Sequence, residues 1–306
     1  ACGNGTAGAF APEALRRMGA EAIDLHTRLD WTFPHYNANP EDSEMLHDMA
    51  AAVRKHGADV ALGFDGDGDR CGVVDDEGEE IFADKVGLML ARDLSREHKN
   101  ATFVVDVKST GLFNVDPVLK ENGVKVDYWK TGHSYIKRRT TELGALAGFE
   151  KSGHFFFRPP LGHGYDDGIV AASAVLAMLD RNQGKKLSDL KRALPKSFTS
   201  LTMSPHCDDE KKYGIVDRVV EDYKNFARTG GKILGRNIRD VNTVNGVRVT
   251  LEDGAWVLVR ASSNKPELVV VVESMTSDDD MRALFRDEVK PRLARFPEVG
   301  AYNQEI

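Results

Sequence analysis

Short apolar runs alternate with amphipathic segments between residues 84 and 181, and this alternation limits the possible fold more than any other feature. The predicted elements, in chain order, are helix 85–96, strand 101–107, helix 112–121, strand 124–129, helix 134–143, strand 145–149 and helix 167–181. Such alternation predicts parallel strands joined by helical crossovers. Because ligands bind at the carboxyl ends of parallel strands, we expect a site where these strands end.

Polar side chains follow each of these three strands. The candidates are Lys108, Lys130, His133, Glu150, Ser152 and His154. Lysine is a flexible point charge for phosphate, imidazole can move protons, and glutamate and serine oxygens can accept from sugar hydroxyls. A single lysine or histidine in a loop is usually a surface residue, so the prediction depends on three loops agreeing.

An acidic loop, Asp65-Gly66-Asp67-Gly68-Asp69-Arg70, separates the two predicted strands 58–64 and 71–74. Three carboxylates at alternate positions repel one another, and a bound divalent cation would remove that repulsion. Oxygen ligands suit magnesium, calcium or manganese better than zinc, and the glycines let the carboxylates converge. Asp65, Asp67 and Asp69 are therefore the predicted metal ligands.

Two other interpretations of this loop remain open. A single Asp-Gly pair is common in a solvated hairpin turn. A helix–loop–helix calcium loop would also place aspartates at its first, third and fifth positions, but it requires glycine where Arg70 stands and glutamate where Asp76 stands. Its flanks should be helices, whereas these flanks are predicted strands.

The first sixty residues are less regular. Gly3, Gly5 and Gly8 fit a Gly-x-Gly-x-x-Gly pattern, but no complete strand precedes them, so a structural turn is favoured over a dinucleotide site. Helices are predicted at 12–18 and 41–56, and a strand near 21–25. Because the chain starts without methionine and on a truncated strand pattern, we expect a fragment of a longer protein. Further along, Asp167 is expected either to cap the helix that follows it or to take part directly in catalysis.

The last third predicts a small antiparallel sheet with helices on one face. The expected elements are strand 198–203, helix 210–226, strands at 247–251, 256–260 and 269–272, and helix 278–293. The turn between the last two strands carries a guanidinium, hydroxyls, an amide and an ammonium, from Arg260, Ser262, Ser263, Asn264 and Lys265. These donors could bind a phosphate, although an ordinary polar hairpin turn has a similar composition.

The 306 residues are enough for several domains, and we expect three, at 1–80, 81–190 and 191–306. A net charge of -7 argues against nucleic acid as a partner, and no apolar run is long enough to span a membrane. The three cysteines are scattered, which predicts neither a disulfide framework nor a zinc site and favours a cytoplasmic protein.

Together the motifs resemble the alpha-D-phosphohexomutase superfamily, and most closely its bacterial phosphomannomutase/phosphoglucomutase enzymes. The matching segments are the acidic loop 65–70, Lys130-Thr131-Gly132-His133-Ser134, Phe149-Glu150-Lys151-Ser152-Gly153-His154 and the turn 260–266. Two departures from the family pattern are Phe149, where the family has glycine, and the altered order of Ser263, Asn264 and Lys265.

The resemblance implies two mixed or parallel α/β sandwich domains and a smaller C-terminal α+β domain. It also implies that the family's first domain, which carries a phosphoserine, is absent from this chain. The implied reaction interconverts hexose 1-phosphate and hexose 6-phosphate through a hexose 1,6-bisphosphate intermediate. Mg²⁺ on the three aspartates would neutralise the phosphoserine, and Arg70 would bind the transferring phosphate.

The resemblance gives the other candidates roles as well. Glu150 and Ser152 would hold sugar hydroxyls, and Lys130 would also contact the substrate. The 260–265 turn would hold the non-reacting phosphate. Lys108, His133 and His154 are the candidates for general acid or base. Without the serine domain, the chain is expected to bind hexose phosphate and Mg²⁺ weakly and not to turn over.

Three alternatives to this function remain. A phosphoglucosamine mutase has a similar sugar loop, a non-catalytic phosphosugar-binding protein would use the same residues, and a calcium-binding module would use only the acidic loop.

Overall fold

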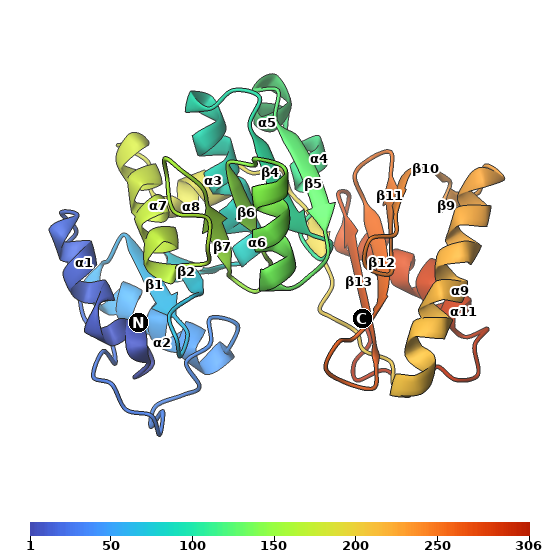
Figure 1. Ribbon diagram of the computed structural model, residues 1–306, viewed down its shortest axis with the longest axis horizontal. Helices are drawn as coiled ribbons and strands as arrows, with labels where there is room; N and C mark the ends of the chain where they lie inside the picture. The colour runs from blue at the N-terminus through green and yellow to red at the C-terminus, as the bar shows by residue number, and fades with distance from the viewer. The chain divides into compact units, whose positions relative to one another are not determined.

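The computed structural model describes all 306 residues, and the chain divides into two compact units (Figure 1). The first unit contains residues 1–109, 117–127 and 131–194, and the second contains 110–116, 128–130 and 195–306. The three-domain division expected from the sequence stays a prediction. Each unit is described below by itself.

The first part of the first unit is an antiparallel sheet covered by α2 (Ser43–His56). Its strands, in the order β1-β2-β3, are Val60–Phe64, Cys71–Asp75 and Glu80–Ile81. Met45, Met49 and Val53 recur on one face of α2 and are buried against this sheet. Phe64 pairs with Cys71, so the acidic loop closes the β1–β2 hairpin.

The chain start packs alongside this sheet. The η1 turn (Thr6–Ala9) and α1 (Ala11–Arg17) follow backbone hydrogen bonds that join Ala1 to β1. The predicted strand near 21–25 is wrong, because this segment makes only an isolated backbone hydrogen bond, from Cys2 to the Leu25 carbonyl, and forms no ladder.

The second part of the first unit is built on a mixed sheet in the order β5-β4-β6-β7. These strands are Lys125–Trp129, Thr102–Asp106, Ala147–Phe149 and Phe155–Phe157. β4 and β6 are parallel, as predicted, whereas β7 returns antiparallel to β6 and was not predicted. Its three phenylalanines are fully buried, so the sequence shows no alternation there.

Helices connect and cover these strands. The long ones are α3 (Ala83–Glu97), α6 (His133–Glu142) and α7 (Gly168–Arg181), and α8 (Leu187–Arg192) ends the first unit. The single helix predicted at 112–121 is instead two: α4 (Leu112–Val115), whose residues belong to the second unit, and α5 (Pro117–Glu121), which belongs to the first. Pro117 explains the break, since proline disfavours helical geometry in the residue before it.

The second unit contains a six-stranded antiparallel sheet in the order β8-β13-β12-β11-β10-β9. The strands are Phe198–Thr199, Leu268–Ser274, Trp256–Ala261, Val247–Leu251, Arg236–Asn242 and Lys232–Ile233. The three predicted central strands are confirmed. The polar strand β10 and the two-residue strand β9 were missed, because neither carries an apolar alternation.

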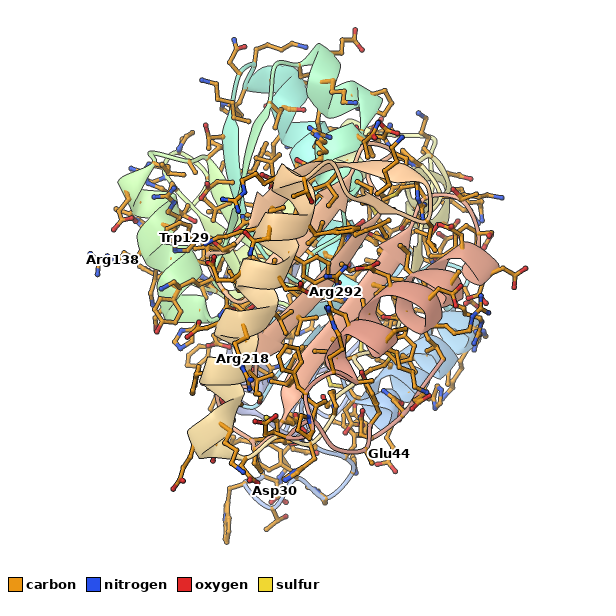
Figure 2. The ribbon with its side chains drawn as sticks, turned by 90° about the vertical axis from the view of Figure 1, so that its right-hand side faces the viewer. Asp30, Glu44, Trp129, Arg138, Arg218 and Arg292 are labelled. Atoms are coloured by element: carbon orange, nitrogen blue, oxygen red, sulfur yellow. The ribbon has the colours of Figure 1, made fainter.

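Two helical segments pack on one face of this sheet through a common apolar core. They are α9 (Asp209–Arg228) and a continuous run of α10 (Asp278–Ala283), η2 (Leu284–Val289) and α11 (Lys290–Leu293). Figure 2 shows Arg292 between the two segments. Its guanidinium donates to Asp222 and Glu288 and lies 4.1 Å from the Tyr223 ring centre, which ties the helices together. The α/β class and the antiparallel C-terminal sheet are confirmed.

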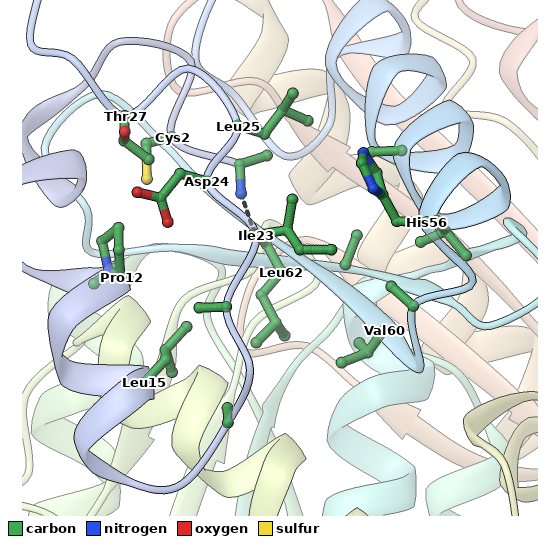
Figure 3. Close-up of a pocket in the computed structure, with 18 of the residues that line it drawn as sticks. Cys2, Pro12, Leu15, Ile23, Asp24, Leu25, Thr27, His56, Val60 and Leu62 are labelled. Carbon is green, nitrogen blue, oxygen red and sulfur yellow. Dashed lines mark hydrogen bonds between the residues drawn. The ribbon is translucent and has the colours of Figure 1, made fainter.

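A cavity of about 320 Å³ lies between α1, the end of α2 and β1 (Figure 3). Its walls are mostly aliphatic, with Leu15, Ile23, Val60 and Leu62 among the lining residues. None of the predicted site residues lines it, so the chemistry must be sought at the strand ends. None of the helices combines the length and the apolar character that a membrane crossing requires.

Candidate active site

The acidic loop brings its three aspartates together. Asp65, Asp67 and Asp69 each offer a carboxylate oxygen, and these oxygens lie within 4.8 Å of one another. Asp65 is buried and organises the loop: its Oδ1 accepts from the backbone N–H groups of Gly68 and Arg70, both at 3.1 Å. The Asp65 Oδ2 accepts from the Arg70 Nε at 2.6 Å. Gly68 has a φ of +81°, which a side chain would strain.

Two glycines from other segments allow the chain to approach this loop closely. A Cβ on Gly5 would lie 2.9 Å from the carbonyl oxygens of Asp65 and Gly66. A Cβ on Gly168, at the start of α7, would lie 2.6 Å from those of Gly68 and Arg70. The glycine-rich turn at the chain start therefore packs against the acidic loop.

Asp69 is a partly buried aspartate close to two other negative charges. Burial and the negative charges of Asp65 and Asp67 raise the pKa of Asp69 to about 7. Its Oδ1 is buried and accepts no hydrogen bond. A carboxylate in this condition, within reach of two others, fits a divalent cation with oxygen ligands.

The turn 150–154 lies directly against the acidic loop. The turn is closed by hydrogen bonds from Glu150 N to His154 O at 2.9 Å and from Gly153 N to Glu150 O at 3.0 Å. The backbone N–H of Cys71 donates to the Gly153 carbonyl at 3.1 Å, and Arg70 and His154 form a β-bridge. Two segments that are eighty residues apart are thereby held side by side.

Two imidazoles and one carboxylate lie close together beside the contact between the acidic loop and the turn 150–154. The Nδ1 atoms of His133 and His154 lie 3.3 Å and 3.2 Å from the same oxygen, Asp166 Oδ2, and the two rings stack at 5.4 Å. Burial lowers the pKa of His154. Lys137 Nζ lies 3.4 Å from Asp166 Oδ1. Asp166 was not predicted as a site residue, although the glycine-rich loop 162–168 that carries it was noticeable in the sequence.

Glu150 is 3 % exposed and only half satisfied. Its Oε1 accepts from the Gly132 backbone N–H at 2.9 Å, while its Oε2 and the nearby Ser152 Oγ are buried without a hydrogen-bond partner. Burial and the negative charge of Asp106 raise the pKa of Glu150 to about 7, and the positive charge of Lys108 opposes this shift.

Asp106 is a second residue that sequence reasoning missed. It ends β4, is fully buried, and accepts from Ser109 Oγ at 2.5 Å and from Thr131 Oγ1 at 3.1 Å. It also accepts from the Lys151 backbone N–H at 3.3 Å. Asp106 therefore links the loops after three strands. The sequence feature that could have identified Asp106 as a site residue is its position at the end of an apolar run.

The remaining predicted residues belong to the second unit. Lys130 follows β5 and is exposed. Arg260 ends β12, is 9 % exposed, and donates to the Ala261 carbonyl at 3.0 Å. Ser262 is buried and its backbone N–H donates to Glu267 O at 3.0 Å, while Ser263, Asn264 and Lys265 are exposed at the tip of the turn.

Lys212 of α9 contacts the backbone of the 260–265 turn. Its side chain is 4 % exposed, and its Nζ donates to the Lys265 carbonyl at 2.9 Å and to Asp209 Oδ1 at 2.5 Å. A buried ammonium bound to a loop carbonyl fixes the position of the turn. Nothing in the local sequence marks this lysine.

Three family models match consecutive parts of the chain. Residues 1–78 match the phosphoglucomutase/phosphomannomutase alpha/beta/alpha domain II, residues 82–198 match domain III, and residues 207–290 match the C-terminal domain. The chain belongs to the phosphoglucomutase/phosphomannomutase family. The resemblance inferred from the sequence motifs is confirmed.

Relatives within this family include a phosphomannomutase/phosphoglucomutase of Pseudomonas putida, 35 % identical over 96 % of this chain and 60 % of that protein. A phosphoglucomutase of Neisseria gonorrhoeae is 34 % identical over 90 % of this chain and 56 % of that protein. A solved family member from Burkholderia thailandensis has a TM-score of 0.83 and 31 % identity, over 98 % of this chain and 60 % of that one. The chain thus spans about 60 % of the length of these relatives.

Proposed function

We propose that this phosphoglucomutase/phosphomannomutase family chain provides the cation, sugar and phosphate sites of an enzyme that interconverts hexose 1-phosphate and hexose 6-phosphate. One observation carries the proposal: five buried polar atoms without hydrogen-bond partners gather on the joined loops of the first unit. They are Asp69 Oδ1, Glu150 Oε2, Ser152 Oγ, His154 Nδ1 and Asp166 Oδ2. Since buried polar atoms are rarely left without partners, such a group indicates a polar ligand.

Asp65, Asp67 and Asp69 are the residues that would hold a magnesium ion. A fungal N-acetylphosphoglucosamine mutase from Aspergillus fumigatus, which shares the fold at a TM-score of 0.56, was crystallised with GlcNAc-6P and magnesium. Mg²⁺, when bound, supplies positive charge that stabilises a transferring phosphoryl group. The oxygen-only set of ligands fits that ion.

Arg70 would bind the transferring phosphate. Its Nε is tied to Asp65 and its Nη1 donates to Asn39 Oδ1 at 3.0 Å, so the guanidinium is already oriented when substrate arrives. A guanidinium fixed in this way loses little conformational entropy on binding phosphate. Asp65 therefore orients Arg70 and would also be a ligand of the cation.

Proton transfer falls to the group formed by His133, His154 and Asp166, with Lys108 as a further candidate. A carboxylate shared by two imidazoles can hold either ring in a fixed orientation, so that the other nitrogen exchanges a proton with a sugar oxygen or phosphate. Glu150 and Ser152 would hold the sugar: when ionised, Glu150 accepts hydrogen bonds from hydroxyls, and the Ser152 hydroxyl can donate or accept.

The second unit would hold the non-reacting phosphate. The donors are Arg260, Ser262, Ser263, Asn264 and Lys265, and Lys130 is a further substrate contact. Two separate phosphate sites are what a hexose 1,6-bisphosphate intermediate requires. The phosphoryl donor would be a phosphoserine on a further domain, so we expect the 306-residue chain to bind hexose phosphates weakly and to show no turnover by itself.

Calorimetric titration of the chain with glucose 6-phosphate and mannose 6-phosphate, in the presence of Mg²⁺, tests this proposal. We expect saturable binding that Glu150→Ala and Arg260→Ala each weaken about tenfold or more, as loss of a charged hydrogen-bond partner predicts. Arg138→Ala is the matched control, because that side chain is 81 % exposed on α6. No saturable binding of any hexose phosphate would refute the proposal.

A phosphoglucosamine mutase is the second candidate. A probable phosphoglucosamine mutase from Methanococcoides burtonii is 29 % identical over 95 % of this chain and 61 % of that protein. Tighter binding of glucosamine 6-phosphate than of either neutral sugar phosphate would favour it. Binding without turnover in the presence of a phosphoserine domain would favour a non-catalytic sensor, and folding dependent on calcium without sugar affinity would favour a calcium module.

A further inference from the structure

We infer that Asp69, His154 and Asp166 form a second cation site, suited to a transition-metal ion such as Zn²⁺ or Co²⁺, next to the aspartate triplet. Asp69 Oδ1 lies 3.5 Å from His154 Nδ1, and Asp166 Oδ2 lies 3.2 Å from the same nitrogen. One ligand atom from each of the three side chains lies within 4.8 Å of the others.

The spacing of these atoms fits a tetrahedral ion. Zinc bonds to nitrogen and carboxylate oxygen are about 2.0–2.1 Å long, so two ligands of a tetrahedral zinc are about 3.3 Å apart. The two nitrogen–oxygen distances of 3.2 Å and 3.5 Å lie on either side of that value. Two of the three distances between ligand atoms therefore already suit the ion, and the third is at most 4.8 Å.

None of these three atoms makes a hydrogen bond, although Asp166 Oδ2 also lies 3.3 Å from His133 Nδ1. Asp69 Oδ1, His154 Nδ1 and Asp166 Oδ2 are each buried. The Asp166 side chain is only 8 % exposed, so water does not readily satisfy its oxygen. Three buried ligand atoms that make no hydrogen bond and lie within 4.8 Å of one another are an observation independent of the number of acidic residues nearby.

The nitrogen ligand distinguishes the metal preference of this site from that of the aspartate triplet. Imidazole suits zinc, cobalt and nickel, whereas magnesium prefers oxygen ligands alone. Asp69 belongs to both groups, so an ion at the mixed site competes for a carboxylate of the triplet. A transition metal there also occupies His154 Nδ1, and we expect it to oppose any function that needs that imidazole free.

An ion can reach the site from solvent. The Asp69 side chain is 30 % exposed, and the exposed His133 places its Nδ1 3.3 Å from Asp166 Oδ2. Water, or His133 after a rotation of its side chain, can supply the fourth ligand that tetrahedral coordination requires. An ion can bind to these three side chains whether or not the chain takes part in a mutase reaction.

Titration of the tag-free chain with Co²⁺, followed by its visible absorption and by competition with Zn²⁺, tests the inference. We expect one ion per chain with the intense absorption of a tetrahedral centre. His154→Gln and Asp166→Asn should each weaken binding by about tenfold or more, because even changes outside the ligand set weaken metal sites by that much.

Two controls separate this site from its surroundings. Asp67→Asn removes a carboxylate that is not a ligand of the proposed site, although its charge acts on Asp69, so this variant should still bind cobalt with a tetrahedral absorption. His163→Gln removes an exposed imidazole outside the group and should keep the cobalt affinity within about twofold of the parent chain. Circular dichroism establishes that each variant is folded. Unchanged Co²⁺ affinity in folded His154→Gln, or loss of it in Asp67→Asn, would overturn the inference.

Discussion

Replacing Gly168 with alanine should both destabilise the first unit and weaken cation binding. The added Cβ would lie 2.6 Å from the carbonyl oxygens of Gly68 and Arg70 and 3.0 Å from the Phe64 ring. The two carbonyls cannot easily retreat, because the loop is fastened by its hydrogen bonds to Asp65. The start of α7 must therefore move away from the acidic loop, or the loop must move.

The expected size follows from known packing costs. Inserting a methyl group into a filled space costs about 1–3 kcal/mol. Alanine in place of glycine in a helix recovers up to about 1 kcal/mol. The net loss is therefore between about 0 and 3 kcal/mol, and its middle range of about 1–2 kcal/mol lowers the melting temperature of a unit of this size by about 2–8 °C. Each 1.4 kcal/mol of strain that the cation-bound loop must absorb lowers Mg²⁺ affinity about tenfold.

Scanning calorimetry and Mg²⁺ titration of Gly168→Ala measure the two effects. Gly214→Ala is the matched control, since a Cβ at that position in α9 meets nothing within 4 Å, and it should stabilise the chain by up to about 1 kcal/mol. If Gly168→Ala melts like the parent chain and binds Mg²⁺ equally well, the close packing of α7 on the acidic loop is not what holds the loop in place.

Three further predictions concern other parts of the chain. The pKa of Glu150 is raised to about 7, so the folded chain keeps a proton that the unfolded chain releases above about pH 4.5, and stability should fall between these pH values by at most about 3 kcal/mol. Because the pKa of Asp69 is raised to about 7 as well, urea unfolding should show a smaller loss in Glu150→Gln than in the parent chain, and an equal loss would contradict this assignment. Lys212→Met removes the ammonium that donates to the Lys265 carbonyl, and it should weaken hexose phosphate binding severalfold in calorimetry. The cobalt affinity should stay unchanged. A hexose phosphate affinity equal to that of the parent chain would show that the 260–265 turn does not need this support. Asp167→Ala removes the side chain that accepts from the N–H groups of Ile169 and Val170, and it should lower the free energy of unfolding in urea by about 1 kcal/mol. Asp167→Asn should keep most of the stability of the parent chain. An alanine variant as stable as the parent would contradict the capping role.

Much of the fold could be predicted because the local pattern decides it. The acidic loop follows a buried strand and precedes another, and the structure places it in the hairpin between β1 and β2. The regular alternation between residues 84 and 181 predicted the parallel pair β4 and β6. The capping role of Asp167 was likewise expected and is seen in the structure.

The failures have physical reasons. β7 is buried on both faces and so shows no alternation, and the segment near 21–25 is apolar enough for a strand but has no neighbouring strand to pair with. Asp166 and Lys212 matter through side chains and carbonyls that are distant in the sequence. Pro117 was a visible break signal, yet the helix prediction ran through it.

Cation binding by the aspartate triplet is tested most directly by a crystal of the chain soaked in Mn²⁺, an oxygen-preferring ion with a measurable anomalous signal. We predict an anomalous peak enclosed by the carboxylates of Asp65, Asp67 and Asp69. An ordered acidic loop without a peak there would contradict the metal site on which the proposed phosphoryl transfer depends.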